Sequence, residues 1–179
     1  MKRPVREARG SDGSSAIVSV RRNISMRSVK IDLRRYRSSD ARGLAAAIDA
    51  VCAEGRWMHT ARFEPTPAWE YALSHPDDMS HLLLVACHED EVVGWCRVFP
   101  GGEDGSAVVG IGLLKPYRDR GVGTQMLGTA IDWARQQGLQ RLVLTTRSDN
   151  ARAIHVFRKY GFQETGRRDG EWIEMALLL

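Results

Sequence analysis

The sequence predicts an α/β protein with a mixed, mostly antiparallel central sheet and flanking helices. Two paired strand-like runs, His81–His88 with Val92–Phe99 and Phe162–Arg167 with Trp172–Leu178, predict two hairpins. Segments with apolar residues at helical spacing lie between the strands. The 179 residues, 43% hydrophobic and 27% charged, are typical of one soluble domain and exclude the disordered and membrane classes.

The first elements of this domain follow from local patterns after residue 28. Val29–Leu33 alternates apolar and polar residues, as a strand with one buried face does. Ser38-Ser39-Asp40 predicts a helix N-terminus, and Gly55 predicts the C-terminal end of that helix. The helix carries the apolar stripe Leu44, Ile48, Val51 and Cys52.

Residues 56–76 are rich in aromatic side chains and in proline. Pro65 and Pro67 limit any helix here to about Ala68–Ser74. The segment is predicted to form a lid over the core, or alternatively a wall that binds the substrate, because ligand pockets favour aromatic linings. The candidate substrate-binding residues are Trp57, Phe63 and Trp69.

The middle of the chain predicts a third strand next to the first hairpin. The acidic turn Glu89-Asp90-Glu91 joins the two hairpin strands, and a glycine-rich loop follows at residues 100–105. The apolar run Ala107–Leu114 then contains Gly110 and Gly112, and interior glycines indicate a bulge or a close approach to the main chain.

The second half of the chain alternates helices and strands. Gly121 to Gln137 predicts a helix, Leu139–Thr146 a buried strand, and Asn150 the cap of a further helix that ends at Gly161. The turn at residues 168–171 closes the last hairpin. The predicted order is strand, helix, helix, three strands, helix, strand, helix and two strands, without an internal repeat.

Positive charge is concentrated at the N-terminus. Residues 1–28 contain seven Lys or Arg against two Asp or Glu, whereas the rest of the chain contains 19 basic and 20 acidic residues. We therefore expect residues 1–28 to be a basic, disordered extension, with Met26 as an alternative start, and residues 29–179 to be the domain. A nucleic-acid partner ranks last, because the domain is near neutral and has no nucleic-acid motif. No apolar run is long enough to suggest a membrane partner.

Cysteine and histidine usage indicates neither a disulfide framework nor a metal site. Three cysteines without CxxC spacing favour the reducing cytoplasm, and no metal-binding spacing of histidines occurs. We expect no metal.

The stretch Leu113–Thr124, LLKPYRDRGVGT, carries the chemistry. It leads from a strand into a helix, whose N-terminal N–H groups and dipole favour phosphate oxygens. Gly121 and Gly123 allow close approach, and Arg118 and Arg120 add charge, so the natural ligand is a pyrophosphate. The loop lacks the lysine of a Walker motif and the third glycine of a Rossmann motif.

A second pattern, Asn150–Phe162, reads NARAIHVFRKYGF. Together the two patterns resemble the GNAT superfamily of acetyl-CoA-dependent N-acetyltransferases. The resemblance covers about residues 29–179, and its specific part is 107–162. It implies the acyl-CoA N-acyltransferase fold and acetyl-CoA as cosubstrate. It further implies these cofactor-binding residues: Leu113, Leu114, Arg118, Asp119, Arg120, Gly121, Val122, Gly123, Thr124, Asn150 and Phe157. Asn150 is equally well explained as an ordinary helix cap.

The catalytic residues are left open. The family's usual tyrosine acid is replaced by Phe157, and Tyr160 lies about 60° further round the helix. A general base must accept the proton of the attacking amine, and the candidates by region are Glu64, Glu70 and Glu174. The two cysteines that could act as nucleophiles, Cys87 and Cys96, are better explained as small buried residues.

The resulting hypothesis is acetyl transfer to a primary amine of a small molecule, such as an amino acid or an analogue. Protein N-terminal or lysine acetylation is the alternative within the enzyme class. A CoA-binding regulatory module without turnover is a further alternative, motivated by Phe157. The apolar end Met175–Leu179 fits an interface strand of a homodimer and equally fits burial in the protein's own sheet.

Overall fold

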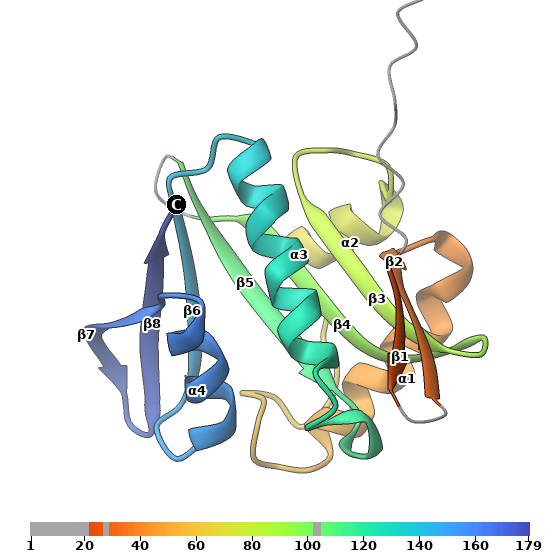
Figure 1. Ribbon diagram of the computed structural model, residues 1–179, viewed down its shortest axis with the longest axis horizontal. Coiled ribbons are helices and arrows are strands. Elements are labelled where there is room, and N and C mark those ends of the chain that lie inside the picture. The colour runs from red at the N-terminus through yellow and green to blue at the C-terminus, as the bar shows by residue number, and fades with distance from the viewer. Residues whose placement is uncertain (1–21, 27–28, 102–104) are drawn as a thin grey trace, which may run out of the picture.

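The computed structural model describes residues 22–26, 29–101 and 105–179, and these form one eight-stranded sheet with helices on both faces (Figure 1). The helices are α1 (Ala41–Cys52), α2 (Pro67–Ser74), α3 (Val122–Gln136) and α4 (Ala151–Lys159), with short 3₁₀ turns η1 (Ser38–Asp40) and η2 (Lys115–Tyr117). The strands are β1 (Arg22–Met26), β2 (Val29–Arg35), β3 (Leu82–His88), β4 (Glu91–Pro100), β5 (Ser106–Leu113), β6 (Arg141–Arg147), β7 (Gln163–Asp169) and β8 (Trp172–Leu178).

The sheet has the order β1-β2-β3-β4-β5-β6-β8-β7, and β5 and β6 are its parallel pair. They pair over three residues only, Ser106–Val108 with Arg141–Val143. Beyond Val108, β5 stays paired with β4 up to Leu113, but its other edge has no strand partner among the described residues. The sheet therefore opens between β5 and β6, which leaves main-chain groups of β5 without ladder partners.

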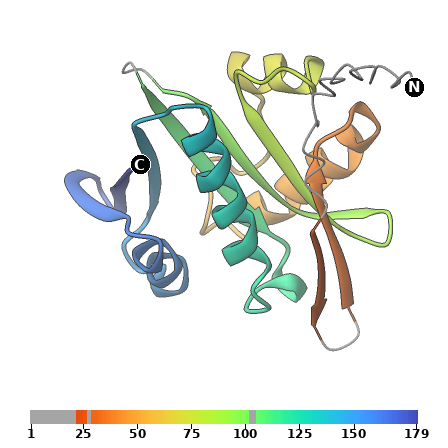
Figure 2. The ribbon, with the colours of Figure 1, turned by 45° about the horizontal axis from the view of Figure 1, so that its top comes forward.

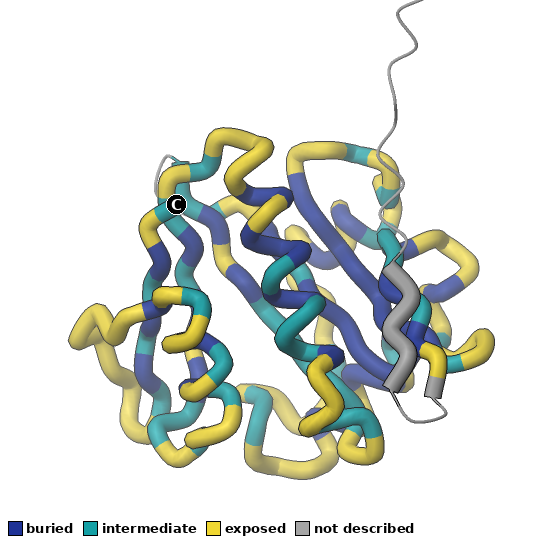
Figure 3. The backbone as a smooth tube through the Cα atoms, viewed as in Figure 1, coloured by how far each residue is buried: buried dark blue, intermediate teal, exposed yellow. Residues whose placement is uncertain are grey.

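Two apolar cores lie on the two faces of the sheet. Helices α3 and α4 cover one face, and α1 and α2 lie on the other (Figures 1 and 2). The first core includes Met126 and Leu127 of α3, and the second includes Leu44 and Ile48 of α1. The strands between them are buried along much of their length (Figure 3). The predicted mixed, mostly antiparallel sheet with flanking helices is thus confirmed.

The helix ends follow the local signals in the sequence. Helix α2 begins at Pro67, whose fixed φ and missing N–H suit a first helical position. Helix α3 follows Gly121, which has φ +78°, and Gly138 after its C-terminus has φ +71°. Both values lie in the left-handed region that glycine adopts without steric cost.

Strand β1 corrects the predicted start of the folded part. Residues 22–26 were expected in a disordered extension, but they pair antiparallel with β2, from Arg22 opposite Leu33 to Met26 opposite Val29. The apolar alternation of Ile24 and Met26 was the overlooked signal. The expectation for residues 1–21 and 27–28 lies outside the described residues.

The two glycines inside β5 do not mark a bulge. The register shift of the central sheet lies between β3 and β4, at Ala86/Cys87, whereas β4 and β5 pair without a shift. A Cβ at residue 112 would lie 2.3 Å from the indole of Trp95. The close approach predicted here is therefore made by side chains of β4 that cross the strand.

Candidate active site

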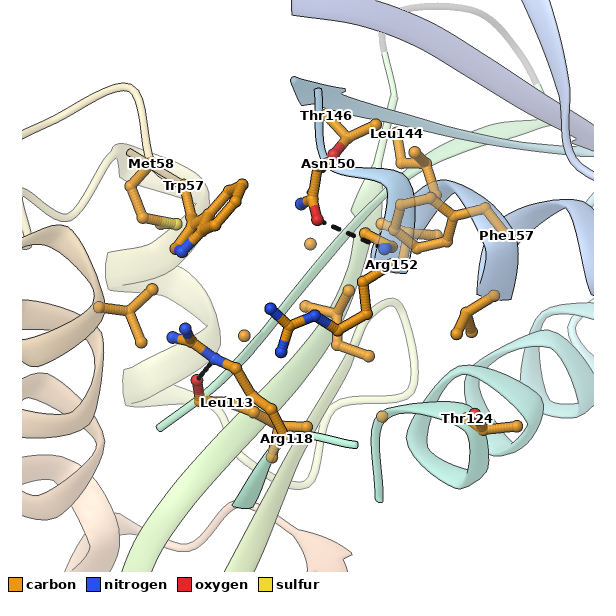
Figure 4. Close-up of a pocket in the computed structure, with 18 of the residues that line it drawn as sticks. Trp57, Met58, Leu113, Arg118, Thr124, Leu144, Thr146, Asn150, Arg152 and Phe157 are labelled. Atoms are coloured by element: carbon orange, nitrogen blue, oxygen red, sulfur yellow. Dashed lines mark hydrogen bonds between the residues drawn. The ribbon is translucent and has the colours of Figure 1, made fainter. Parts of the chain in front are cut away.

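A cavity of about 230 Å³ lies where the sheet opens between β5 and β6 (Figure 4). It is bounded by the open edge of β5, the loop before α3, the end of β6, helix α4, and residues from α1 and the segment after it. The lining residues predicted from sequence are Trp57, Leu113, Arg118, Asp119, Gly121, Gly123, Thr124, Asn150 and Phe157. Those that the prediction did not include are Val51, Met58, Val109, Gly110, Ile111, Gly112, Leu144, Thr145, Thr146, Arg152, Ala153 and Val156.

Three of the predicted cofactor-binding residues do not line this cavity. Val122 is buried in the core beneath α3, and Arg120 is exposed. The main-chain N–H of Leu114 donates to the Val93 carbonyl, 2.9 Å away. The residues of the predicted loop, 113–124, therefore do not all face the cavity, because some lie in the core or on the surface.

The turn before α3 and the first turn of that helix line the cavity. Asp119 has φ +59° and Gly121 has φ +78°, so the chain turns sharply just before the helix. The first N–H groups of α3 have no helical acceptor, and the helix dipole places partial positive charge there. Gly123 faces the side chain of Leu113, with 3.3 Å between the position of a Cβ and Leu113 Cδ1. This end of the cavity is suited to an anion.

The Arg118 side chain is already paired within the protein. Its Nε donates to the Leu113 carbonyl at 2.8 Å, and its Nη1 donates to Glu54 Oε2 at 2.8 Å (Figure 4 shows the first bond). Its Nη2 donates to the other Glu54 oxygen. This pairing with Arg118 lowers the pKa of Glu54. Because Trp57 Nε1 also donates to Glu54, at 3.0 Å, the network ties the segment after α1 to the glycine turn.

Arg152, which the sequence patterns did not single out, also reaches into the cavity. Its Nη1 lies 2.8 Å from Asp119 Oδ2, and Figure 4 shows its guanidinium extending between Asn150 and Arg118. It is the second residue of α4 and therefore lies near the N-terminus of that helix as well. Its position within the Asn150–Phe162 pattern was the available signal.

Asn150 serves as the cap of α4 and also lines the cavity. Its Oδ1 accepts from the Ala153 N–H at 3.3 Å, and its Nδ2 donates to Thr146 Oγ1 at 3.3 Å. The capping role predicted from sequence is confirmed. It fixes the side chain at the end of β6, beside the open edge of β5.

Phe157 and Tyr160 have different environments. Phe157 is 5% exposed and its ring lines the cavity. The Tyr160 hydroxyl donates to the Thr124 carbonyl at 2.8 Å and lies against Gly128 of α3. Burial raises the pKa of Tyr160. Among the described residues that line the cavity, none is a tyrosine or cysteine.

The aromatic residues after α1 fall into two groups. Trp57 lines the cavity, together with Met58. Phe63 and Trp69 instead form an edge-to-face series with Phe99 of β4, with ring centroids 5.2 and 5.1 Å apart. Trp69 is 8% exposed, so it belongs to the core beneath the segment. The lid interpretation thus describes these two residues well, and Trp57 fits the wall interpretation.

The segment after α1 also crosses to the C-terminal half of the sheet. Arg56 Nη2 lies 3.2 Å from Asp149 Oδ2, and His59 stacks on Trp172 of β8 with 3.7 Å between ring centroids. These contacts place the segment across the opening between β5 and β6. A molecule in the cavity would therefore contact residues from both halves of the chain.

The candidate bases are not gathered at one point. Glu64 is exposed and pairs with Arg62, and Glu70 is exposed on α2. Glu174 of β8 has a side chain only 17% exposed and lies opposite Thr145, which lines the cavity. It accepts a hydrogen bond of 2.8 Å from Thr165 Oγ1. Of the three, Glu174 is the one that is paired in the sheet with a cavity-lining residue.

The cysteines Cys87 and Cys96 are buried in the sheet. Burial raises the pKa of both thiols, that of Cys96 to about 12. Within the described part of the chain, no three His, Cys, Asp or Glu side chains are grouped to hold a metal ion. Among the same residues, no helix has the length and apolar character needed to span a membrane.

A sheet opened between two parallel strands, with a glycine turn entering a helix at the opening, is the architecture of acyl-CoA N-acyltransferases. The sequence model of the acetyltransferase (GNAT) family matches residues 46–162. The chain therefore belongs to the GNAT family.

Relatives and solved structures agree with this assignment. The chain is 31% identical over 114 residues to streptothricin acetyltransferase A of Bacillus subtilis, and the match covers 60% of this chain and 66% of that protein. It is 33% identical over 108 residues to the L-methionine sulfoximine/L-methionine sulfone acetyltransferase of Pseudomonas aeruginosa, covering 54% and 62%. The chain thus spans slightly less than two thirds of either relative.

The fold is shared with yncA, a putative acetyltransferase of Salmonella typhimurium whose structure contains acetyl-CoA. The TM-score is 0.69 at 20% identity, over 83% of this chain and 94% of that one.

Proposed function

We propose that the protein transfers the acetyl group of acetyl-CoA to a primary amine of a small molecule, such as an amino acid or an analogue. Membership of the family supports the reaction class. The two relatives described above act on small molecules, one on streptothricin and one on amino-acid analogues. The acetyl-CoA in the structure that shares this fold supports the cosubstrate.

The observation that carries the proposal is the opening between β5 and β6 beside a glycine turn. Pairing of β5 with β6 ends at Val108, so main-chain groups on that edge of residues 109–113 are available to a pantetheine arm, except the Leu113 carbonyl, which accepts from Arg118. The turn at Gly121 and the first N–H groups of α3 suit the pyrophosphate. Glu54 pairs with Arg118 and Asp119 pairs with Arg152, so both arginines already have a carboxylate beside them. The positive charge that we assign to the phosphates therefore comes from the N-terminus of α3 and from the exposed Arg120.

Bound acetyl-CoA supplies an activated acyl group, and the protein contributes position and electrostatics. The amine enters from the side of Trp57, Met58 and Thr145. It must be neutral to attack, and Glu174 is the base that we propose, since it lies beside Thr145 in the sheet. The amine loses one proton and the departing sulfur gains one. We propose that the proton taken from the amine reaches the sulfur through water, so that no acid is needed at position 157.

A covalent route through cysteine is disfavoured. Cys96 is fully buried with a pKa of about 12, and burial likewise raises the pKa of Cys87. Since the thiolate is the nucleophile, both thiols are unreactive near neutral pH. Direct attack by the amine in a ternary complex follows.

The test combines a binding assay with a turnover assay on the purified full chain. We expect CoA and acetyl-CoA to raise the melting temperature, and amino acids or analogues to trigger thiol release from acetyl-CoA. Preferential thiol release with peptides would establish protein acetylation instead. Binding of CoA without thiol release over both panels would favour the regulatory module, and the absence of any shift with CoA would contradict the cofactor site.

A further inference from the structure

Arg97 of β4 is a partly buried cation that has no hydrogen-bond acceptor or carboxylate partner among the described residues. It lies between Trp95 and Phe99 on the face of the sheet that α1 and α2 cover. Burial lowers the pKa of its guanidinium. Within the described part of the chain, Arg97 makes no side-chain hydrogen bond and no ion pair. Five N–H donors removed from much of the solvent without acceptors cost free energy.

Other partly buried arginines of the protein have hydrogen-bond acceptors. Arg34 of β2 forms a two-point pair with Asp40, at 2.6 and 2.8 Å. Arg35 donates to the carbonyls of Asp78 and His81, each at 3.0 Å. Arg118 is paired with Glu54. The fold thus supplies acceptors where arginine is structural, and Arg97 departs from this pattern.

The immediate surroundings of Arg97 hold the side chain but do not neutralise it. Its Cζ lies 4.9 Å from the centroid of Phe99 and 5.6 Å from that of Trp69. Ring faces attract a cation without accepting directional hydrogen bonds from all of its N–H groups. The aromatic residues therefore orient a guanidinium whose donors stay available.

Gly110 connects Arg97 to the proposed active site. The two residues are paired across β4 and β5, and Arg97 Nε lies 2.8 Å from where a Cβ of residue 110 would be. The Arg97 side chain therefore lies over Gly110, which lines the cavity. Arg97 is not itself one of the lining residues, but its guanidinium group lies against Gly110 in the cavity wall.

We propose that Arg97 binds the carboxylate of the acceptor, so that the preferred substrates are α-amino acids or analogues that carry an anionic group beside the amine. The inference rests on the proposed function and narrows its substrate class. A guanidinium matches a carboxylate by two parallel hydrogen bonds. In an α-amino acid a single carbon separates the carboxylate from the amine, so a carboxylate held beside Gly110 keeps the amine near the open edge of β5.

The first experiment compares matched acceptors with the unmodified protein. L-methionine and L-phenylalanine are assayed beside their carboxamides, which differ in the anionic group. We expect kcat/KM to be at least about tenfold higher for the acids, as the loss of a charge-assisted pair implies. The α-amino group of a carboxamide loses its proton more readily than that of the free amino acid. Intrinsic reactivity alone would therefore favour the carboxamides, which is the opposite of the expected result. Equal or higher kcat/KM for the amides would overturn the inference.

The second experiment removes the cation. Arg97→Gln should lower kcat/KM for the acids by roughly 10- to 100-fold and leave that for the amides within about twofold. Arg97→Lys should restore part of the loss, because it keeps the charge without the planar fork. Arg42→Gln, at an exposed position on α1, is the matched control and should change neither value. Equal losses for acids and amides would show a structural role only.

Failure of the inference is distinguishable from failure of the proposed function. If thiol is released equally well with the acids and with their carboxamides, the role of Arg97 is overturned but the acetyltransferase activity is supported. If no amine releases thiol, binding of L-methionine to the protein with CoA is measured by calorimetry. Binding that Arg97→Gln abolishes supports the carboxylate site, and absence of binding overturns it. If Arg97→Gln does not fold, the acid and amide comparison with the unmodified protein decides.

Discussion

The hydroxyl of Tyr160 is used to join two helices. It donates to the Thr124 carbonyl in the first turn of α3, and a Cβ at residue 128 would lie 2.7 Å from its oxygen. Phe157, one turn earlier, has the position at the cavity but no proton to donate. The spacing of three residues thus separates a structural hydroxyl from a cavity-lining ring.

Tyr160→Phe tests this division. We expect a loss of about 1 kcal/mol in the free energy of unfolding, since a partly buried hydrogen bond is removed, and an unchanged kcat between pH 6 and 9. Denaturant titration and thiol-release kinetics measure the two quantities. Tyr36→Phe, on the other face of the sheet, is the matched control. A tenfold fall in kcat at unchanged stability would identify Tyr160 as an acid.

At the scale of elements, the two ends of α3 carry glycines in the same backbone conformation. Gly121 before the helix and Gly138 after it have φ +78° and +71°. Only the first lines the cavity. A comparison of Gly121 with Gly138 therefore distinguishes the effect of the left-handed backbone conformation from an effect on binding in the cavity.

Alanine substitutions at these two glycines should therefore have one effect in common and one that differs. Gly121→Ala and Gly138→Ala should each cost about 1–2 kcal/mol of stability, because a Cβ is unfavourable in the left-handed region. Only Gly121→Ala should also lower the affinity for CoA, by at least about tenfold, because it displaces the N–H groups of the turn. Calorimetry measures the affinity. Equal CoA affinity for both variants would place the pyrophosphate elsewhere.

Elements and motifs were predictable where their signals are local. Gly138 and Asn150 mark the end of α3 and the start of α4 directly. Contacts between distant segments were not predictable in this way. The pairing of Arg118 with Glu54 joins residues 64 positions apart, and no spacing rule links them. Local patterns therefore predicted several of the residues that line the cavity, but not which of the charged ones are already paired.

At the scale of the whole molecule, the basic N-terminal region and the start of the sheet overlap in sequence. Strand β1 carries Arg22 and belongs to the sheet. It also covers the edge of β2, whose inner neighbour is β3. The basic surplus of residues 1–28 thus overlaps with an element of the fold.

Chains that begin at Arg22 and at Val29 differ by β1 and the two residues after it. We expect the shorter chain to lose at least about 1 kcal/mol of stability and to associate more readily, because the edge of β2 becomes an unpaired template. Urea denaturation and light scattering measure these effects. CoA affinity should be the same in both, since the cavity is formed by later residues. Equal stability would show that β1 contributes nothing to the folded sheet, whereas loss of CoA binding alone would connect the first strand to the active site.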